Sequence, residues 1–170
     1  MTSNDKKLIL LRHAKSSWDY PLLPDFARPL QEKGIQRMAS VGVFLQKKQI
    51  IPQQIISSYA VRAYQTAVIA AAALKYSPEN ITIASDLYFQ GSHSILQYLK
   101  QQSDQQQVIM LVGHNPDFSD LAELLLRKNI EMPTAGVLLL EWKHVSWQNF
   151  DQDLPKNALS FFKNDLKNIY

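Results

Sequence analysis

The chain has 170 residues, 46% of them hydrophobic and 19% charged, with a formal net charge of +3 and no cysteine. Its length suits a single globular domain over residues 1–170, and the missing cysteine excludes disulfides, thiolate nucleophiles and cysteine-ligated metals. The chain has no block of about five like charges, no apolar run of the roughly 18 residues that a membrane helix needs, and no apolar signal core in its N-terminus MTSNDKK. We therefore expect a cytoplasmic protein that binds neither nucleic acid nor membrane.

Apolar runs alternate with helical patterns along the chain. In chain order we expect a strand at 7–11, a helix at 29–47, a strand at 54–57, a helix at 59–74 after a Ser57–Ser58 cap, a strand at 81–85, a helix at 94–101, a strand at 107–112, a helix at 117–128 and a strand at 136–142. The segment 144–150 could form an edge hairpin with 136–142, and the tail 157–170 has a helical spacing. Alternating strands and helices predict a three-layer α/β/α fold, in which helices flank a mostly parallel central sheet.

Two of the four histidines follow predicted strands. LILL leads into Arg12 and His13, VIMLV leads through Gly113 to His114, and QIIS leads after a short turn to Arg62. Ligands of open parallel sheets bind at the carboxyl ends of the strands, so neighbouring strands would bring these side chains together. Each residue alone is more often structural. Two guanidiniums beside two imidazoles, however, are costly to bury unless an anion completes the cluster.

A phosphoryl group is the anion that fits this cluster, because arginine forks match its oxygens in pairs. An imidazole nitrogen can attack phosphorus and form a phosphohistidine. In this interpretation His13 attacks, while Arg12, Arg62 and His114 stabilise the equatorial oxygens. The chemistry requires no metal or other cofactor, and no G-x-x-x-x-G-K-[ST] pattern indicates a P-loop nucleotide site.

Three stretches of the sequence resemble a known family. Residues 11–14 (LRHA) resemble the Arg-His-Gly signature of the histidine phosphatase superfamily, also called phosphoglycerate mutase-like, and residues 58–66 and 112–116 resemble its second arginine and second histidine motifs. Residues 12–18, 25–30 and 133–137 resemble the short SixA-like phosphohistidine phosphatases. The resemblance implies a phosphoglycerate mutase-like fold, His13 as nucleophile and a phosphoryl group held by Arg12, Arg62 and His114. It also implies further substrate contacts from Arg28, Ser16 and Asn115, although Arg28 and Ser16 could be ordinary helix-start and turn residues.

The sequence departs from the family pattern at the general acid. Ester phosphatases and mutases of the superfamily carry a carboxylate after the third strand, where this chain reads DLYFQ at 86–90. Asp86 is the nearest candidate, and it could simply mark the strand end. Phosphohistidine needs less help from an acid than an ester, because imidazole leaves more readily than an alkoxide. The sequence therefore favours a metal-independent phosphohydrolase that removes phosphate from phosphohistidine on a protein. A phosphatase of small phosphate esters and a non-catalytic phosphate-binding module are the alternatives.

Overall fold

The computed structural model describes residues 4–163 and 165–169. Within these ranges one seven-stranded sheet has the order β3-β2-β4-β1-β5-β6-β7. The strands are β1 (Lys6–Arg12), β2 (Gln54–Ser57), β3 (Thr82–Ile83), β4 (Val108–Gly113), β5 (Val137–Trp142), β6 (Asn157–Phe162) and β7 (Asp165–Asn168). The α-helices are α1 (Glu32–Lys47), α2 (Val61–Ala73), α3 (Ser92–Lys100) and α4 (Asp117–Leu126). None of the helices in the described ranges combines the length and apolar composition needed to cross a membrane.

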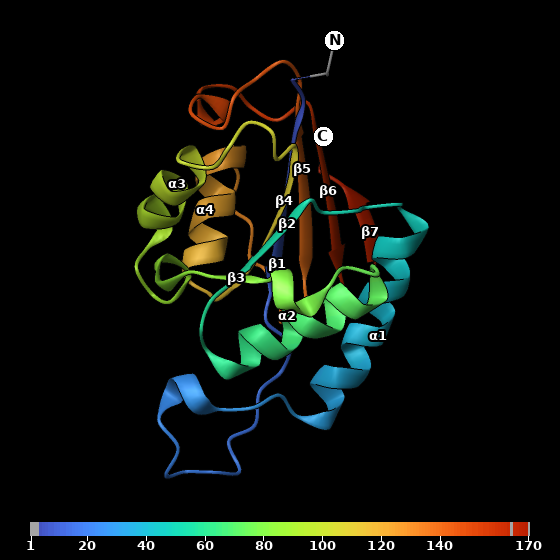
Figure 1. Ribbon diagram of the computed structural model, residues 1–170, viewed down its shortest axis with the longest axis vertical. Helices are drawn as coiled ribbons and strands as arrows, with labels where there is room; N and C mark the ends of the chain where they lie inside the picture. Colours follow the sequence, from blue (N-terminus) through green and yellow to red (C-terminus); the bar gives the residue numbers. More distant parts are fainter. Residues whose placement is uncertain (1–3, 164, 170) are drawn as a thin grey trace.

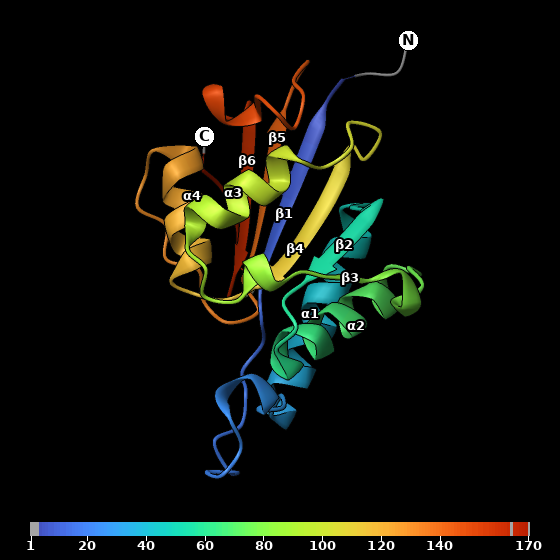
Figure 2. The same cartoon turned by 60° about the vertical axis from the view of Figure 1, so that its left-hand side comes forward.

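The sheet separates two helical layers, with α1 and α2 on one face and α3 and α4 on the other (Figures 1 and 2). The pairs β3–β2, β2–β4 and β4–β1 are parallel, whereas β5, β6 and β7 are each antiparallel to the preceding strand in the sheet. Because two reversals restore the direction, β6 runs the same way as β1, and five of the seven described strands share one direction. The predicted three-layer α/β/α class is confirmed.

The apolar runs of the sequence arise because both faces of the sheet are covered. Along β1, Leu8 and Leu10 pack into the core under α3 and α4, while Ile9 and Leu11 pack into the core under α1 and α2. All four are fully buried. Successive side chains of a strand point to opposite faces, so a strand covered on both sides has no polar positions to alternate with.

The C-terminal segment differs from the predicted helix. Residues 157–162 form β6, which pairs with β5 and then with β7, while residues 164 and 170 lie outside the described part. The burial follows a strand period: Ala158 belongs to the core on one face of the sheet, and Leu159 and Phe161 pack with the core on the other. The helical spacing of this stretch is coincidental, because pairing with β5 decides its conformation.

The predicted edge hairpin is also wrong, because β5 takes β6 and not 144–150 as its antiparallel partner. Residues 144–150 form turns, and a 3-10 helix begins at Phe150. Trp147 and Phe150 are fully buried, with ring centroids 5.3 Å apart. Their side chains serve the core without adding a strand.

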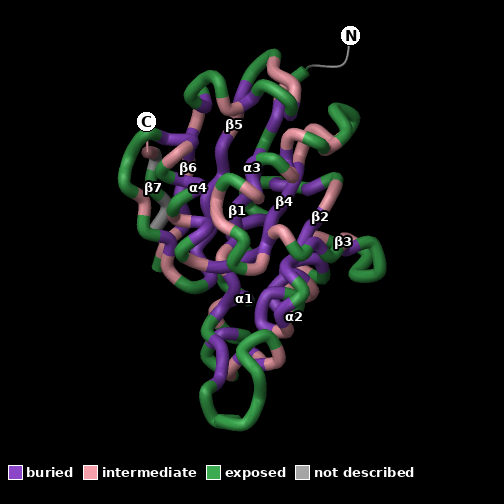
Figure 3. The backbone as a smooth tube through the Cα atoms, turned by 90° about the vertical axis from the view of Figure 1, so that its left-hand side faces the viewer, coloured by how far each residue is buried: buried purple, intermediate pink, exposed green. Residues whose placement is uncertain are grey.

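A long loop joins β1 to α1 and projects beyond the carboxyl end of β1 (Figures 1 and 3). Its residues 18–26 are exposed, whereas Ser16 and Leu30 form an isolated β-bridge at its base. The Ser17 N–H also donates to the Pro29 carbonyl at 2.8 Å, so the two ends of the loop are joined to each other.

The predicted helix start at Pro29 is wrong, because α1 begins at Glu32 and Pro29 precedes it.

Candidate active site

The order β2-β4-β1 places three sequence motifs side by side. Arg12 is in register with Gly113, and the His13 N–H donates to the Gly113 carbonyl at 2.9 Å. This pairing brings His13 to His114, whose ring centroid lies 5.0 Å away. The β2 end, next to β4, leads into α2 and so delivers Arg62 from the third motif. The predicted convergence of these segments is therefore observed.

His13 is held as a neutral imidazole with one nitrogen available. Its Nδ1 lies 2.7 Å from the Ala14 carbonyl oxygen, which only accepts, so Nδ1 carries the proton and Nε2 keeps its lone pair. Burial lowers the pKa of His13 to about 4, and the charges of Arg62, Arg12 and Arg28 add to this against the hydrogen bond to Ala14. Near pH 7 the ring is thus uncharged, the state that a nucleophile requires.

His114 presents the opposite nitrogen. Its Nε2 lies 2.9 Å from Ser58 Oγ, which itself accepts from the Ala60 N–H at 3.3 Å. The hydroxyl proton is therefore best used in donating to His114 Nε2, which leaves the proton of the neutral ring on Nδ1. This Nδ1 is buried and has no hydrogen-bond partner among the described residues. Burial, His13 and Arg62 lower the pKa of His114 to about 2, so the ring is a neutral donor.

Ser58 has a different role from the one expected. The cap predicted at Ser57–Ser58 is wrong, because Ala60 is the N-terminal cap residue of α2 and makes no side-chain cap hydrogen bond. Ser58 is fully buried against His114 instead. Sequence analysis missed it as a site residue, although it begins the second arginine motif.

Arg12 and Asn115 share one acceptor. Arg12 Nη1 donates to the Met132 carbonyl at 2.7 Å, and Asn115 Nδ2 donates to the same oxygen at 3.0 Å. Arg12 Nε and Asn115 Oδ1 are buried and have no hydrogen-bond partner within the described part of the chain. Burying a guanidinium N–H without an acceptor costs free energy, and a bound anion would supply the missing acceptor for Arg12 Nε.

Arg62 and Arg28 converge on Asp25, a residue that sequence analysis did not assign to the site. Arg62 donates from Nη2 to Asp25 Oδ2 at 2.7 Å and from Nη1 to the Asp25 carbonyl at 2.6 Å. Arg28 donates from Nη1 to Asp25 Oδ1 at 2.8 Å and from Nη2 to Ser16 Oγ. The structure thus joins Arg28 and Ser16 to Arg62 through Asp25, and both arginines are buried.

Tyr88 closes this side of the cluster. Its hydroxyl donates to Asp25 Oδ2 at 2.8 Å, and its ring lies edge-on to His114 with centroids 5.3 Å apart. Tyr88 belongs to the stretch in which the sequence lacked an acid. Asp86, the acid candidate of that stretch, accepts a hydrogen bond from Ser94 of α3 at 3.2 Å. The carboxylate that contacts both Arg28 and Arg62 is Asp25.

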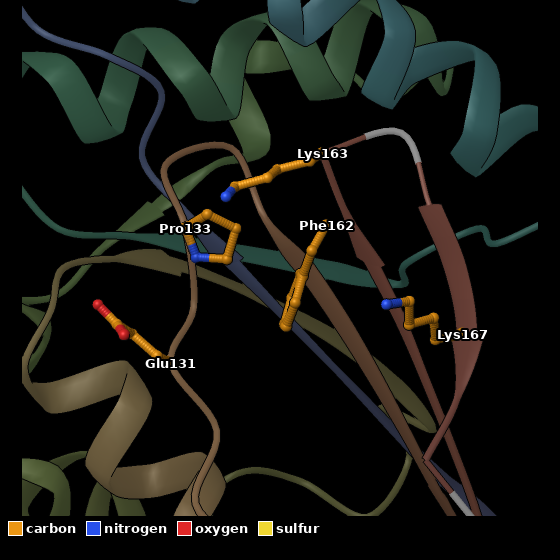
Figure 4. A pocket seen from close by; sticks show the side chains of 5 residues that line it. All are labelled: Glu131, Pro133, Phe162, Lys163 and Lys167. Atoms are coloured by element: carbon orange, nitrogen blue, oxygen red, sulfur yellow. The ribbon is translucent and has the colours of Figure 1, made fainter.

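A pocket of about 340 Å³ is lined by Glu131, Pro133, Phe162, Lys163 and Lys167 (Figure 4). Glu131 and Pro133 flank Met132, whose carbonyl accepts the hydrogen bond from Arg12. Burial lowers the pKa of Arg12, and the Glu131 carboxylate opposes this shift. Neither histidine of the candidate site lines this pocket.

Both the sequence and the fold of the chain match known proteins. Residues 8–87 match the profile described as Histidine phosphatase superfamily (branch 1). An uncharacterized chloroplastic protein of Arabidopsis thaliana is 32% identical over 155 residues, which cover 86% of this chain and 71% of that protein. Among solved structures, a candidate phosphohistidine phosphatase SixA from Agrobacterium tumefaciens is 28% identical with a TM-score of 0.71, covering 82% of this chain and 96% of that one. A candidate SixA from Nakamurella multipartitia is 20% identical with a TM-score of 0.72, covering 89% and 92%.

Proposed function

Because this chain belongs to the histidine phosphatase superfamily and to its SixA-like branch, we propose that it is a phosphatase acting through a phosphohistidine on His13. One observation carries the proposal: His13 is a buried, neutral imidazole whose Nδ1–H is fixed by the Ala14 carbonyl. Its Nε2 lone pair is thereby free within a group of three arginines. A neutral nucleophile among fixed cations is the arrangement that attack on a phosphoryl group requires.

In the proposed reaction His13 Nε2 attacks phosphorus. The charge on the phosphoryl oxygens is met by Arg12, Arg62 and the Nδ1–H of His114. As the attacking ring gains positive charge, its Nδ1–H bond to the Ala14 carbonyl becomes charge-assisted and stronger. Water then attacks the phosphorus of phospho-His13 and releases inorganic phosphate. Arg28, Ser16 and Asn115 are proposed to contact the substrate or to support these arginines.

We propose phosphohistidine on a protein as the substrate. Support comes from the Agrobacterium tumefaciens relative, a candidate phosphohistidine phosphatase. The position of the cluster also fits, since it lies at the sheet edge beside the exposed loop 18–26, where another protein can approach. The cytoplasmic location and the absence of nucleic-acid partners stay predictions.

The decisive experiment is to trap the intermediate. The protein is mixed with a phosphohistidine protein carrying labelled phosphate and then quenched. The expected phosphoenzyme is labile in acid and stable in alkali, and it is absent from His13→Ala. His93→Ala removes an exposed histidine of α3 and serves as the matched control, so it should label as the wild type does. Full turnover by His13→Ala would contradict the proposal.

A second candidate is a phosphatase of small phosphate esters, and the Asp25 carboxylate favours it. An ester needs a proton on its leaving alkoxide, and Asp25 is a carboxylate in contact with the phosphate-binding arginines. The two candidates are separated by kcat/KM on a phosphohistidine protein and on common esters. Much faster ester turnover would reverse the preference, and tight vanadate binding with no turnover would indicate a binding module.

A further inference from the structure

Asp25 accepts hydrogen bonds from three side chains of the candidate site. Its Oδ1 accepts from Arg28, and its Oδ2 accepts from both Arg62 and Tyr88 at 2.7 and 2.8 Å. Arg62 is only 3% exposed, so the carboxylate is the counter-ion that makes its burial tolerable. Asp25 itself is 44% exposed at its side chain and can reach solvent for a proton.

The same carboxylate is linked to the His114 imidazole of the site. Tyr88 links it to His114, against whose ring it packs. Asp25 raises the pKa of His114 electrostatically, against the larger lowering from burial, His13 and Arg62. Burial would raise the pKa of Asp25, but hydrogen bonds from Arg62 and Tyr88 hold it below the usual range. In the free protein Asp25 is therefore an ionised carboxylate.

Binding of a phosphoryl dianion changes this balance, an argument that rests on the proposed function. The dianion would bind the same Arg62 whose two Nη groups already face Asp25. Two anions on one guanidinium repel each other, and in such pairs one group takes up a proton. Asp25 is the partner that can do so, because it keeps a side open to water.

We infer that Asp25 is the proton carrier of the proposed reaction, a role for which the sequence supplied no satisfactory candidate. In the first step the bond between phosphorus and the leaving atom breaks and the bond to His13 Nε2 forms, while the Asp25 proton passes to the leaving atom. In the second step a water oxygen bonds to phosphorus and the bond to His13 Nε2 breaks, while one water proton returns to Asp25. The carboxyl group thus ends each cycle with the proton that it carried at the start.

The test uses Asp25→Asn, with Asp86→Asn as the matched control that removes the other candidate carboxylate. Both are assayed on substrates ordered by leaving group, from phosphohistidine and nitrophenyl phosphate to an alkyl phosphate. We expect Asp25→Asn to lose little on the best leaving groups and about 10²–10⁴-fold on the poorest that the wild type turns over. Asp86→Asn should match the wild type throughout. Asp25→Glu should restore part of the lost rate, and circular dichroism confirms that each variant is folded.

If the wild type accepts phosphohistidine alone, the pH dependence of phosphoenzyme formation decides. The wild type should show an alkaline decline that Asp25→Asn lacks, because only a protonated carboxyl group can donate. An equal loss of rate on every substrate, or an unchanged alkaline decline, would overturn the inference and leave Asp25 as a positioning residue for Arg62. The proposed function fails separately, when no phosphoenzyme forms on His13 of the wild type.

Discussion

The strongest physical claim about the site is that His13 is buried and uncharged, and this can be measured as a dependence of stability on pH. The folded pKa of His13 is about 4, whereas an unfolded histidine titrates near 6.5. Between these pH values the unfolded chain therefore binds a proton at His13 that the folded chain does not bind. The contribution of neutral His13 to the free energy of unfolding is complete above about pH 6.5 and is lost as the pH falls toward 4.

The size of the effect follows from the two pKa values. Between pH 7.5 and pH 5.0 the protonation of unfolded His13 should cost about 2 kcal/mol of the free energy of unfolding. His13→Gln abolishes this cost while keeping a polar side chain of similar length. The variant should therefore lose about 2 kcal/mol less than the wild type over the same interval. The remaining loss belongs to other groups, among them His114, whose pKa is also lowered by burial.

The assay is equilibrium unfolding in urea at both pH values, followed by the fluorescence of the buried Trp142 and Trp147. Ser40→Ala, on the exposed face of α1, is the control and should reproduce the wild-type pH dependence. The slopes against urea must agree between variants, so that the comparison reports stability alone. If His13→Gln loses as much stability as the wild type between the two pH values, His13 is not a buried neutral group. It would then lack the uncharged state that a nucleophile requires.

Two further substitutions test contacts that support the site. Gly34→Ala would place a Cβ against the Lys15 carbonyl oxygen and 2.9 Å from the Lys15 backbone nitrogen, so the backbone must move. We expect the free energy of unfolding in urea to fall by about 1–3 kcal/mol. An unfolding midpoint equal to that of the wild type would contradict this packing. Ser58→Ala removes the hydroxyl that forms a hydrogen bond with His114 Nε2, so the His114 ring can change tautomer. It should lower kcat about tenfold, the worth of one such hydrogen bond, and an unchanged kcat would remove Ser58 from the site.

The parallel part of the fold could be predicted because each of its signals is local. A short apolar run predicts a doubly covered strand, and an amphipathic run between two of them predicts a crossover helix. The C-terminal hairpin could not be read this way. In β6 the residues NALSFF fit both a helical and a strand period, and the deciding contact is with β5, earlier in the chain. Long-range pairing settles such ambiguous stretches.

The same distinction separates the predicted site residues from the missed ones. His13 and His114 stand where strands end, and strand ends meet at one edge of a sheet. Asp25 stands on the projecting loop, 37 residues from Arg62 and 63 from Tyr88, and no strand places any of these contacts. A local signal did exist: Asp25 lies three residues before Arg28, at the spacing of their ion pair. That spacing alone cannot reveal that Arg62 joins the pair.

The arginines of the site connect binding to nucleophilicity. The charges that would hold a phosphoryl group, Arg12, Arg28 and Arg62, are also those that lower the pKa of His13 beyond what burial does. A bound dianion would offset these charges and raise the proton affinity of both His13 and Asp25. Nε2 of His13 cannot hold a proton and attack phosphorus as well, whereas Asp25 has an open side from which to take one. Placing the proton on Asp25 is therefore the arrangement that keeps the lone pair of His13 directed at phosphorus while supplying the leaving atom.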